Sequence, residues 1–200
     1  MTGTVLTRGY HHLPRGCLAN VVTCLEMRER PVPRATVSDG LSLAPLAGGR
    51  EAYLQLYRLV GSDWMWFSRL AMPSERLESI LESPLVDAYV LRQAGRDAGL
   101  LELDFRETGQ CELAFFGLAP GAIGKGAGRY LMEQAIGKAW AKPIRRFWVH
   151  TCTFDHPHAL GFYQRSGFRP YQAMVEVHDD PRLQGLLPRD SSSHVALIDS

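Results

Sequence analysis

CELAFFGLAPGAIGKGAGR, residues 111–129, is the stretch that decides how this 200-residue chain folds. It predicts a buried strand, a glycine-rich turn and the start of a helix, because the helical pattern RYLMEQAIGKAWA begins at Arg129. Gly124, Gly126 and Gly128 alternate in the turn, and glycines let a backbone approach a ligand closely. The first N–H groups of a helix lack intrahelical partners, and the helix dipole favours negative charge there. The stretch therefore predicts a site for phosphate or pyrophosphate, with a plain connecting loop as the alternative.

Two common phosphate-binding motifs fit this turn poorly. A Walker loop needs Ser or Thr after Gly-Lys, whereas Gly126 follows Gly124-Lys125, so no hydroxyl is placed for Mg²⁺. A dinucleotide fingerprint needs GxGxxG, whereas this turn reads GxGxG and the next glycine, Gly137, lies inside the predicted helix. A nucleotide-binding protein that uses the same turn stays open as a lesser hypothesis.

The segment after this helix adds a second signal. RRFWVHTCTF predicts another strand, and DHPHALGFYQRSGFRPY predicts a short helix leading to a last strand. With the glycine turn, these residues resemble the GNAT superfamily of acyl-CoA N-acyltransferases from about Val86 to Tyr171. The family's central motif, (Arg/Gln)-x-x-G-x-(G/A), is matched by Ile123-Gly124-Lys125-Gly126-Ala127-Gly128, with Ile123 departing at the first position. Its later motif of Asn, Ala, Tyr and Gly-Phe is matched at His156, Ala159, Tyr163 and Gly167-Phe168, with His156 replacing Asn.

The resemblance implies an α/β, GNAT-like fold, in which a mixed central β-sheet is flanked by helices and splayed between the fourth and fifth strands. These are the strands at 111–119 and 146–152, which run parallel because a helix connects them. We expect residues 1–16 to form a flexible N-terminal arm, residues 17–178 a single acetyltransferase domain, and residues 179–200 a C-terminal tail.

The first half of the chain is predicted to hold one strand and then helices. CLANVVTCLEM at 17–27 is apolar and β-branched, whereas 28–40 contains Pro and Gly and predicts a loop. Leu43, Leu46 and later apolar residues recur at roughly helical spacing, which predicts a helix at 50–60.

DWMWFSRL, residues 63–70, is the densest aromatic patch. In the resembled family, the helices and loop after the first strand line the acceptor side. Trp64, Trp66 and Phe67 are therefore candidate substrate-binding residues. Packing of these rings in the core is the alternative, because aromatic side chains dominate protein cores.

Acetyl-CoA is the co-substrate that the resemblance implies, and we expect no metal. In the family the glycine turn holds the pyrophosphate through backbone N–H groups, here those of Ile123, Gly124, Lys125, Gly126, Ala127, Gly128 and Arg129. Lys125 and Arg129 would add charge. The pantetheine arm pairs with the preceding strand, here at Phe116, Gly117 and Leu118. A backbone N–H near Leu118 would polarise the thioester carbonyl and hold the oxyanion.

Glu112 is the leading candidate for the general base. An amine is mostly protonated at neutral pH, so a base must remove its proton before it attacks the thioester. Glu112 stands six residues before Leu118, and strict alternation puts both on one face of the strand. Some members of the resembled family keep their base at this place. Glu102 and Asp104, on the adjacent strand, are the substitutes.

Tyr163 is the candidate general acid for the leaving thiolate, because it occupies the family's Tyr position and a phenol can protonate a thiolate. Asp155 and His156 lie where the family places an Asn that contacts CoA, so both are candidate cofactor contacts, as is Tyr163. His156 is also a candidate second base. We expect His150 and His158 to be structural or exposed.

The composition is that of an ordinary globular chain. A formal net charge of +1 gives no reason to expect a nucleic-acid or membrane partner. The four cysteines are widely spaced with no CxxC, and the start of the chain has no apolar signal-peptide region. We therefore expect a cytoplasmic protein with reduced thiols.

The function predicted from these features is transfer of an acetyl group from acetyl-CoA to a primary amine, by direct attack in a ternary complex. The acceptor is a small molecule or a peptide. A non-catalytic acyl-CoA-binding regulatory or sensor domain is the alternative. Dimerisation is common in the family, so a homodimer stays open.

Overall fold

The computed structural model describes residues 5–36 and 39–199. The predicted arm, the loop at 28–40 and the tail lie partly outside these residues. The described elements are β1 (Cys17–Met27), β2 (Leu41–Pro45), α1 (Gly49–Gly61), η1 (Ser62–Trp64), α2 (Ser74–Leu81), β3 (Val86–Gln93), β4 (Arg96–Asp104), β5 (Gln110–Leu118), η2 (Pro120–Ala122), α3 (Ala127–Ala139), β6 (Arg146–Cys152), α4 (Ala159–Arg165) and β7 (Arg169–Asp179). No helix among them is both long and apolar enough to cross a membrane.

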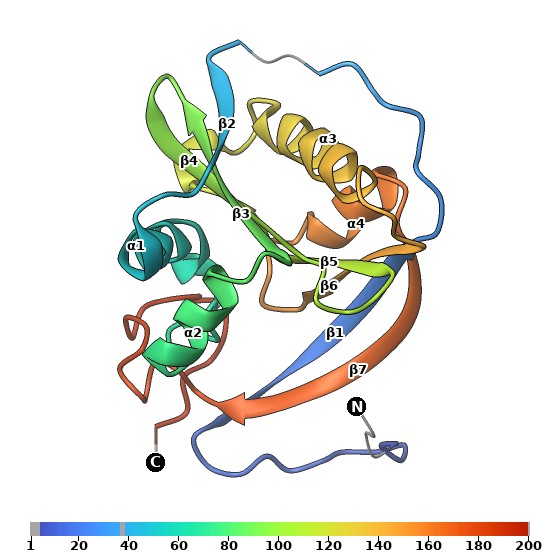
Figure 1. Ribbon diagram of the computed structural model, residues 1–200. Coiled ribbons are helices and arrows are strands. Elements are labelled where there is room, and N and C mark those ends of the chain that lie inside the picture. Colours follow the sequence, from blue (N-terminus) through green and yellow to red (C-terminus); the bar gives the residue numbers. More distant parts are fainter. Residues whose placement is uncertain (1–4, 37–38, 200) are drawn as a thin grey trace.

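The described strands form one mixed sheet in the order β2-β3-β4-β5-β6-β1-β7 (Figure 1). Only the β5–β6 pair among them is parallel, and α3 makes that crossover. Helices α1 and α2 cover one face of the sheet and α3 and α4 cover the other (Figure 1). We call these the α1 face and the α3 face. The predicted α/β class with a mixed sheet flanked by helices is confirmed.

Each face is built from the alternating side chains of the central strands. On the α1 face, Tyr53 and Tyr57 of α1 pack against Leu100 of β4. On the α3 face, Leu131 of α3 packs against Leu101 of β4. Because apolar side chains are buried on both faces, the central strands form a rigid frame for the residues that lie between the two layers of helices.

A bulge in β5 changes which of its residues share a face. Opposite Glu102 and Leu103 of β4 stand Phe115 and Leu113, so Ala114 is the extra residue. Before the bulge, Glu112 is paired with Asp104 and shares the α1 face with it, because cross-strand partners share a face.

After the bulge the alternation is inverted. Phe116 and Leu118 pack with the α3-face cluster, whereas Phe115 packs with the α1-face cluster. The prediction that Glu112 shares a face with Leu118 is therefore wrong, because it assumed strict alternation through Ala114.

The ladder between β5 and β6 is short. It joins Gln110, Cys111 and Glu112 to Arg146, Phe147 and Trp148. The residues of β5 after Glu112 remain paired with β4.

Strand β2 was not anticipated. Leu43 and Leu46 were assigned to helical spacing, but Leu41–Pro45 pairs antiparallel with β3 at the edge of the sheet. Leu43 packs with the α3-face cluster and Leu46 with the α1-face cluster. Two apolar residues three positions apart can lie on one face of a helix or on opposite faces of an edge strand, so their spacing alone does not distinguish a helix from a strand.

Because β2 was not among the predicted strands, the strands predicted as the fourth and the fifth correspond to β5 and β6.

The segment after β7 packs onto the loop that follows η1. The guanidinium of Arg182 is buried, donates to the Asp180 carboxylate, and also donates to the carbonyl oxygens of Ser191, Val195 and Ala196. Leu187 packs with Met65 and Phe154. The Ser192 hydroxyl donates to the Asp63 carbonyl at 2.7 Å. The segment therefore packs against and supports residues 63–70, which we call the aromatic loop.

Candidate active site

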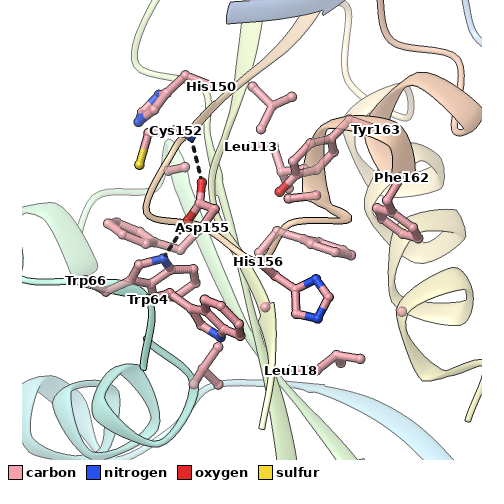
Figure 2. A pocket seen from close by; sticks show the side chains of 18 of the residues that line it. Trp64, Trp66, Leu113, Leu118, His150, Cys152, Asp155, His156, Phe162 and Tyr163 are labelled. Carbon is pink, nitrogen blue, oxygen red and sulfur yellow. Dashed lines mark hydrogen bonds between the residues drawn. The ribbon is translucent and has the colours of Figure 1, made fainter. Parts of the chain in front are cut away.

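A cavity of about 1000 Å³ lies where the β5–β6 ladder ends (Figure 2). It is lined by Tyr57 and Trp66 on the α1 face and by Met132 and Phe162 on the α3 face. The cavity is therefore lined from both faces of the sheet.

Most of the residues selected from the sequence line this one cavity. They are Glu112, His156 and Tyr163; Phe116, Gly117, Leu118, Ile123, Gly124, Gly126, Gly128, Arg129 and Asp155; and Trp64, Trp66 and Phe67. Lys125 and Ala127 do not line it. Ala127 is buried in the α3-face core, and the Lys125 ammonium donates to the Gly121 carbonyl at 3.0 Å.

The glycine turn has an open backbone surface. Gly124 and Gly126 have φ of 84° and 82°, in the left-handed region that side chains disfavour. A Cβ at either residue would meet no atom within 4 Å, so their backbone faces open space. Gly126 is the N-cap residue of α3, so the free N–H groups of the helix start lie at this end of the cavity. The turn therefore fits the pyrophosphate site predicted from the sequence.

Trp66 fills a slot made by two glycines on the α1 face. A Cβ at Gly61 would overlap the Trp66 side chain, and a Cβ at Gly117 would overlap Val60 and lie 3.0 Å from the indole. The indole also packs against Tyr57 and Phe115, with centroids 5.4 and 5.2 Å away. Gly117 is thus required by the close approach of α1 and Trp66 to the strand.

Asp155 ties the loop after β6 to Trp66. Its carboxylate accepts from the Thr151 hydroxyl at 2.7 Å. It also accepts from the Cys152 amide at 2.9 Å and from the Trp66 indole N–H at 3.4 Å (Figure 2). These contacts give Asp155 a part in shaping the cavity.

His156 lies between the aromatic loop and α4. Its ring makes an edge contact with Trp64, with centroids 5.0 Å apart. Its Nδ1 accepts from the His158 amide at 3.1 Å, which leaves Nε2 as the nitrogen free to face the cavity.

Tyr163 extends from α4 into the cavity, opposite Trp64 and Trp66 (Figure 2). The residue is 7 % exposed, and its ring lies edge-on to Phe116 and Phe168. Burial, with a smaller effect of the Asp155 charge, raises the pKa of the Tyr163 hydroxyl well above its usual value. The hydroxyl is therefore protonated at neutral pH and available as a donor.

Glu112 lies beside His150, which was expected from the sequence to be structural or exposed and which the structure places in the cavity lining. Its Oε1 is 3.6 Å from Nδ1 of His150 on β6, and both side chains line the cavity. Trp148, the ladder partner of Glu112, precedes His150 by two residues, so His150 shares the α1 face. Contact with the Glu112 carboxylate raises the pKa of His150, against the opposing effect of burial. Finding this contact required the register of β6 against β5, which the periodicity along either strand does not give.

The two substitute carboxylates are already bound to arginines. Glu102 is fully buried and accepts from the Tyr53 hydroxyl and the Arg69 guanidinium. Asp104 binds Arg106 at 2.5 Å. Burial raises the pKa of Asp104, but the side-chain and backbone hydrogen bonds and the charge of Arg106, with the Arg69 charge, together hold it below its usual value. Glu112 is thus the better candidate of the three.

Arg34 is a second lining residue that the sequence analysis missed. The connection from β1 to β2 passes α3 and α4 (Figure 1), where the Arg34 amide donates to Glu133 at 3.1 Å. The Arg34 guanidinium donates to the Arg165 carbonyl at 2.8 Å. Together with Arg129 and Arg165, it gives the α3-face side of the cavity a positive rim.

No group of three or more His, Cys, Asp or Glu side chains within residues 5–36 and 39–199 is arranged to hold a metal ion.

The chain belongs to the acetyltransferase (GNAT) family, whose model matches residues 53–168. The fold agrees with that family, since solved GNAT structures share it. A comparison with curated proteins gave no match.

Solved GNAT structures share the fold at low sequence identity. A GCN5-related N-acetyltransferase from Sphaerobacter thermophilus has a TM-score of 0.62 at 13 % identity, over 80 % of this chain and 51 % of that one. One from Kribbella flavida has a TM-score of 0.55 at 17 % identity, over 85 % of this chain and 63 % of that one.

An aminoglycoside acetyltransferase from an uncultured soil metagenomic sample, in complex with trehalose, has a TM-score of 0.52 at 19 % identity, over 64 % of this chain and 88 % of that one. The chain thus spans between half and two thirds of the first two structures it matches. At these identities the likeness concerns the fold.

Proposed function

We propose that this GNAT acetyltransferase transfers an acetyl group from acetyl-CoA to a primary amine, by direct attack in a ternary complex. The observation that carries the proposal is the single cavity lined from both faces of the sheet. One side offers free helix N–H groups and positive charge, and the other offers a carboxylate and aromatic rings. A ligand with a phosphate end and a reactive end suits such a cavity.

The α3-face side would bind the phosphates of acetyl-CoA. The open backbone at Gly124 and Gly126 leaves room for a pyrophosphate on the N–H groups from Ile123 to Arg129. Arg129, Arg34 and Arg165 would add charge at the rim. Lys125 would contribute less, because its ammonium is bonded to the turn itself.

The free edge of β5 would bind the pantetheine arm, beside Phe116, Gly117 and Leu118. The Ala119 N–H donates to Ala98 of β4 at 2.9 Å, so the preceding Leu118 N–H points to the opposite edge of the strand. That N–H would hold the oxyanion formed when the amine attacks. A preorganised donor of this kind is worth about 10²–10³ in rate.

The proton transfers are assigned to Glu112 and Tyr163. Glu112 would supply the carboxylate of the base, with Asp155 and His156 shaping its surroundings and His156 as a second candidate base. Tyr163 would donate a proton to the thiolate as the C–S bond breaks. Burial makes the hydroxyl a weaker acid than an ordinary phenol, so its part would be to hydrogen-bond to the sulfur as negative charge develops there, with the proton moving only as the C–S bond breaks.

The acceptor would lie on the α1-face side, against Trp64, Trp66 and Phe67. Trp66 is fixed by its slot, whereas Trp64 and Phe67 belong to the loop in front of it. We propose a small-molecule or peptide amine, and a cytoplasmic setting in which the four cysteines stay as the free thiols the structure shows.

A non-catalytic acyl-CoA sensor is the second candidate. It would share the phosphate side but need neither Glu112 nor Tyr163 facing the cavity. Thermal unfolding with acetyl-CoA, CoA, ATP and NADH in parallel shows which of these compounds the protein binds. A ligand at about 100 times its Kd stabilises the fold by roughly 2.7 kcal/mol.

Stabilisation by acetyl-CoA and CoA alone, followed by thiol release with added amines, is the expected outcome. Stabilisation without thiol release would favour the sensor. Stabilisation by ATP or NADH alone would overturn both.

A further inference from the structure

We infer that the base is a pair, in which His150 takes the proton from the acceptor amine and Glu112 positions the His150 imidazole. The inference rests on the proposed function and refines it. It is carried by the position of the two side chains on adjacent parallel strands, at the point where their ladder ends.

The strand register brings the two side chains together. Glu112 is in the last β5–β6 pair, opposite Trp148. His150 lies one alternation further along β6 on the same face. Because the bulge at Ala114 comes after Glu112, the carboxylate stays on the α1 face with the acceptor side of the cavity.

The exposure of the two groups suggests their order. The His150 side chain is 49 % exposed and the Glu112 side chain 26 %. The imidazole is thus the more accessible of the two groups to a molecule in the cavity. With Nδ1 facing Glu112, the other ring nitrogen, Nε2, is left to meet an amine, which is the arrangement by which a carboxylate orients a histidine base.

The groups around His150 favour its protonated form. On its own strand the neighbour is Cys152, on β1 it is Cys24, on β5 Glu112, in the loop Asp155, and on β7 Glu176. The three carboxylates all raise the pKa of His150, and the Glu112 contact is the largest cause. A raised pKa makes the neutral imidazole a stronger base, and it also raises the pH above which the imidazole is neutral and able to accept a proton.

The proton balance of the step is simple. His150 Nε2 accepts a proton from the amine while the amine nitrogen bonds to the thioester carbon. The C–S bond then breaks, and the CoA sulfur receives a proton from Tyr163. The imidazolium stays beside the Glu112 carboxylate until it returns its proton to solvent, and solvent restores the Tyr163 proton.

The pair itself is tested by NMR titration of the histidine rings in the full-length protein, with His150 assigned from His150→Gln. The Glu112→Gln variant keeps shape and removes the charge, and should lower the pKa of His150 towards its usual value. The matched control is Glu176→Gln, which removes a carboxylate that also acts on His150 without an ion-pair contact. An equal or smaller shift in Glu112→Gln than in Glu176→Gln would overturn the pair.

The catalytic role is tested by thiol release from acetyl-CoA with benzylamine or 1,4-diaminobutane as acceptor, and with water as acceptor when neither reacts. His150→Gln and Glu112→Gln should each lower kcat/KM about 100-fold or more, and the double variant should be little worse than either. His194→Gln, at an exposed histidine outside the cavity, should match the parent.

The acidic limb of the pH profile should move to lower pH in Glu112→Gln, because the imidazole then loses its proton more easily. Full activity in His150→Gln with loss in Glu112→Gln would overturn the role of His150 and leave the proposed function standing. Thiol release at the uncatalysed rate in the parent would overturn the proposed function, and with it the proton transfer, while the titration would still decide whether the pair exists.

Discussion

The two sides of the cavity differ in how they are built. The α3-face side is made mainly by one continuous stretch, in which β5, the glycine turn and the start of α3 follow one another in the chain. The α1-face side is assembled from β1, α1, the aromatic loop, β5, β6 and β7, and is supported by the segment around Arg182.

Because the two sides are built differently, they suit different roles in a member of this family. A phosphate site needs backbone N–H groups in one local geometry, and a short stretch can supply them. An acceptor site needs side chains from several elements, each of which can change without disturbing the turn. We therefore expect variants of the glycine turn and its basic rim to affect CoA binding, variants of Tyr163 to affect turnover, and variants of the α1-face side to affect turnover or packing.

The largest effect is expected for Tyr163→Phe. Removing the hydroxyl should lower kcat about 100- to 10,000-fold, because the leaving thiolate loses its proton donor. Steady-state thiol release measures this, with Tyr171→Phe on β7 as the control outside the cavity. The stabilisation by CoA should be unchanged, and an unaltered kcat would remove Tyr163 from the mechanism.

A smaller effect, on stability, is expected for Gly117→Ala. The new methyl group overlaps Val60, and overpacking of this kind costs about 1–3 kcal/mol. Gly128→Ala is the matched control, because its Cβ would make ordinary contacts of 3.6–3.9 Å and its φ is not positive. Urea unfolding should separate the two variants. Equal stability would contradict the close packing of α1 on the strand.

Gly126→Ala tests the turn. A side chain at φ 82° costs about 1–2 kcal/mol, so either the fold is weakened by that amount or the turn changes shape. We expect CoA to bind about tenfold more weakly, measured by calorimetry.

Gly137→Ala, inside α3 with free space around its Cβ, should instead stabilise the protein by about 0.5–1 kcal/mol and leave CoA affinity unchanged. Equal CoA affinity in both variants would mean that the turn is only a connection.

The smallest effect distinguishes two basic residues. Arg34→Ala should weaken CoA binding by up to about fivefold, because an exposed charge contact contributes up to about 1 kcal/mol. Lys125→Ala should change it less, since Lys125 is outside the lining. The difference should shrink as salt is added. A larger loss of CoA affinity for Lys125→Ala than for Arg34→Ala would mean that Lys125, and not Arg34, supplies the positive charge at the rim of the cavity.

The sequence predicted the local parts of this fold well. The first strand, β5, the glycine turn, α3 and β6 follow from apolar periodicity and from glycines at a helix start, which are properties of neighbouring residues. The face predicted for the Glu112 side chain was wrong, because the bulge at Ala114 arises from the pairing of β5 with β4 and not from the sequence of β5 alone.

Residues brought in by tertiary contacts had no comparable signal. Strand β2 at Leu41–Pro45 needed knowledge of its partner β3. Arg34 reaches the cavity through a long connection held by α3 and α4. His150 needed the register of β5 against β6. Such contacts depend on where distant segments meet, which periodicity along one segment does not encode.

A crystal structure of the protein with CoA tests the central claim most directly. We predict the pyrophosphate on the N–H groups from Gly124 to Arg129, the pantetheine arm along the free edge of β5, and the sulfur near Tyr163 at the end of the β5–β6 ladder. CoA bound away from the glycine turn, or with its sulfur remote from both Tyr163 and Glu112, would contradict the account.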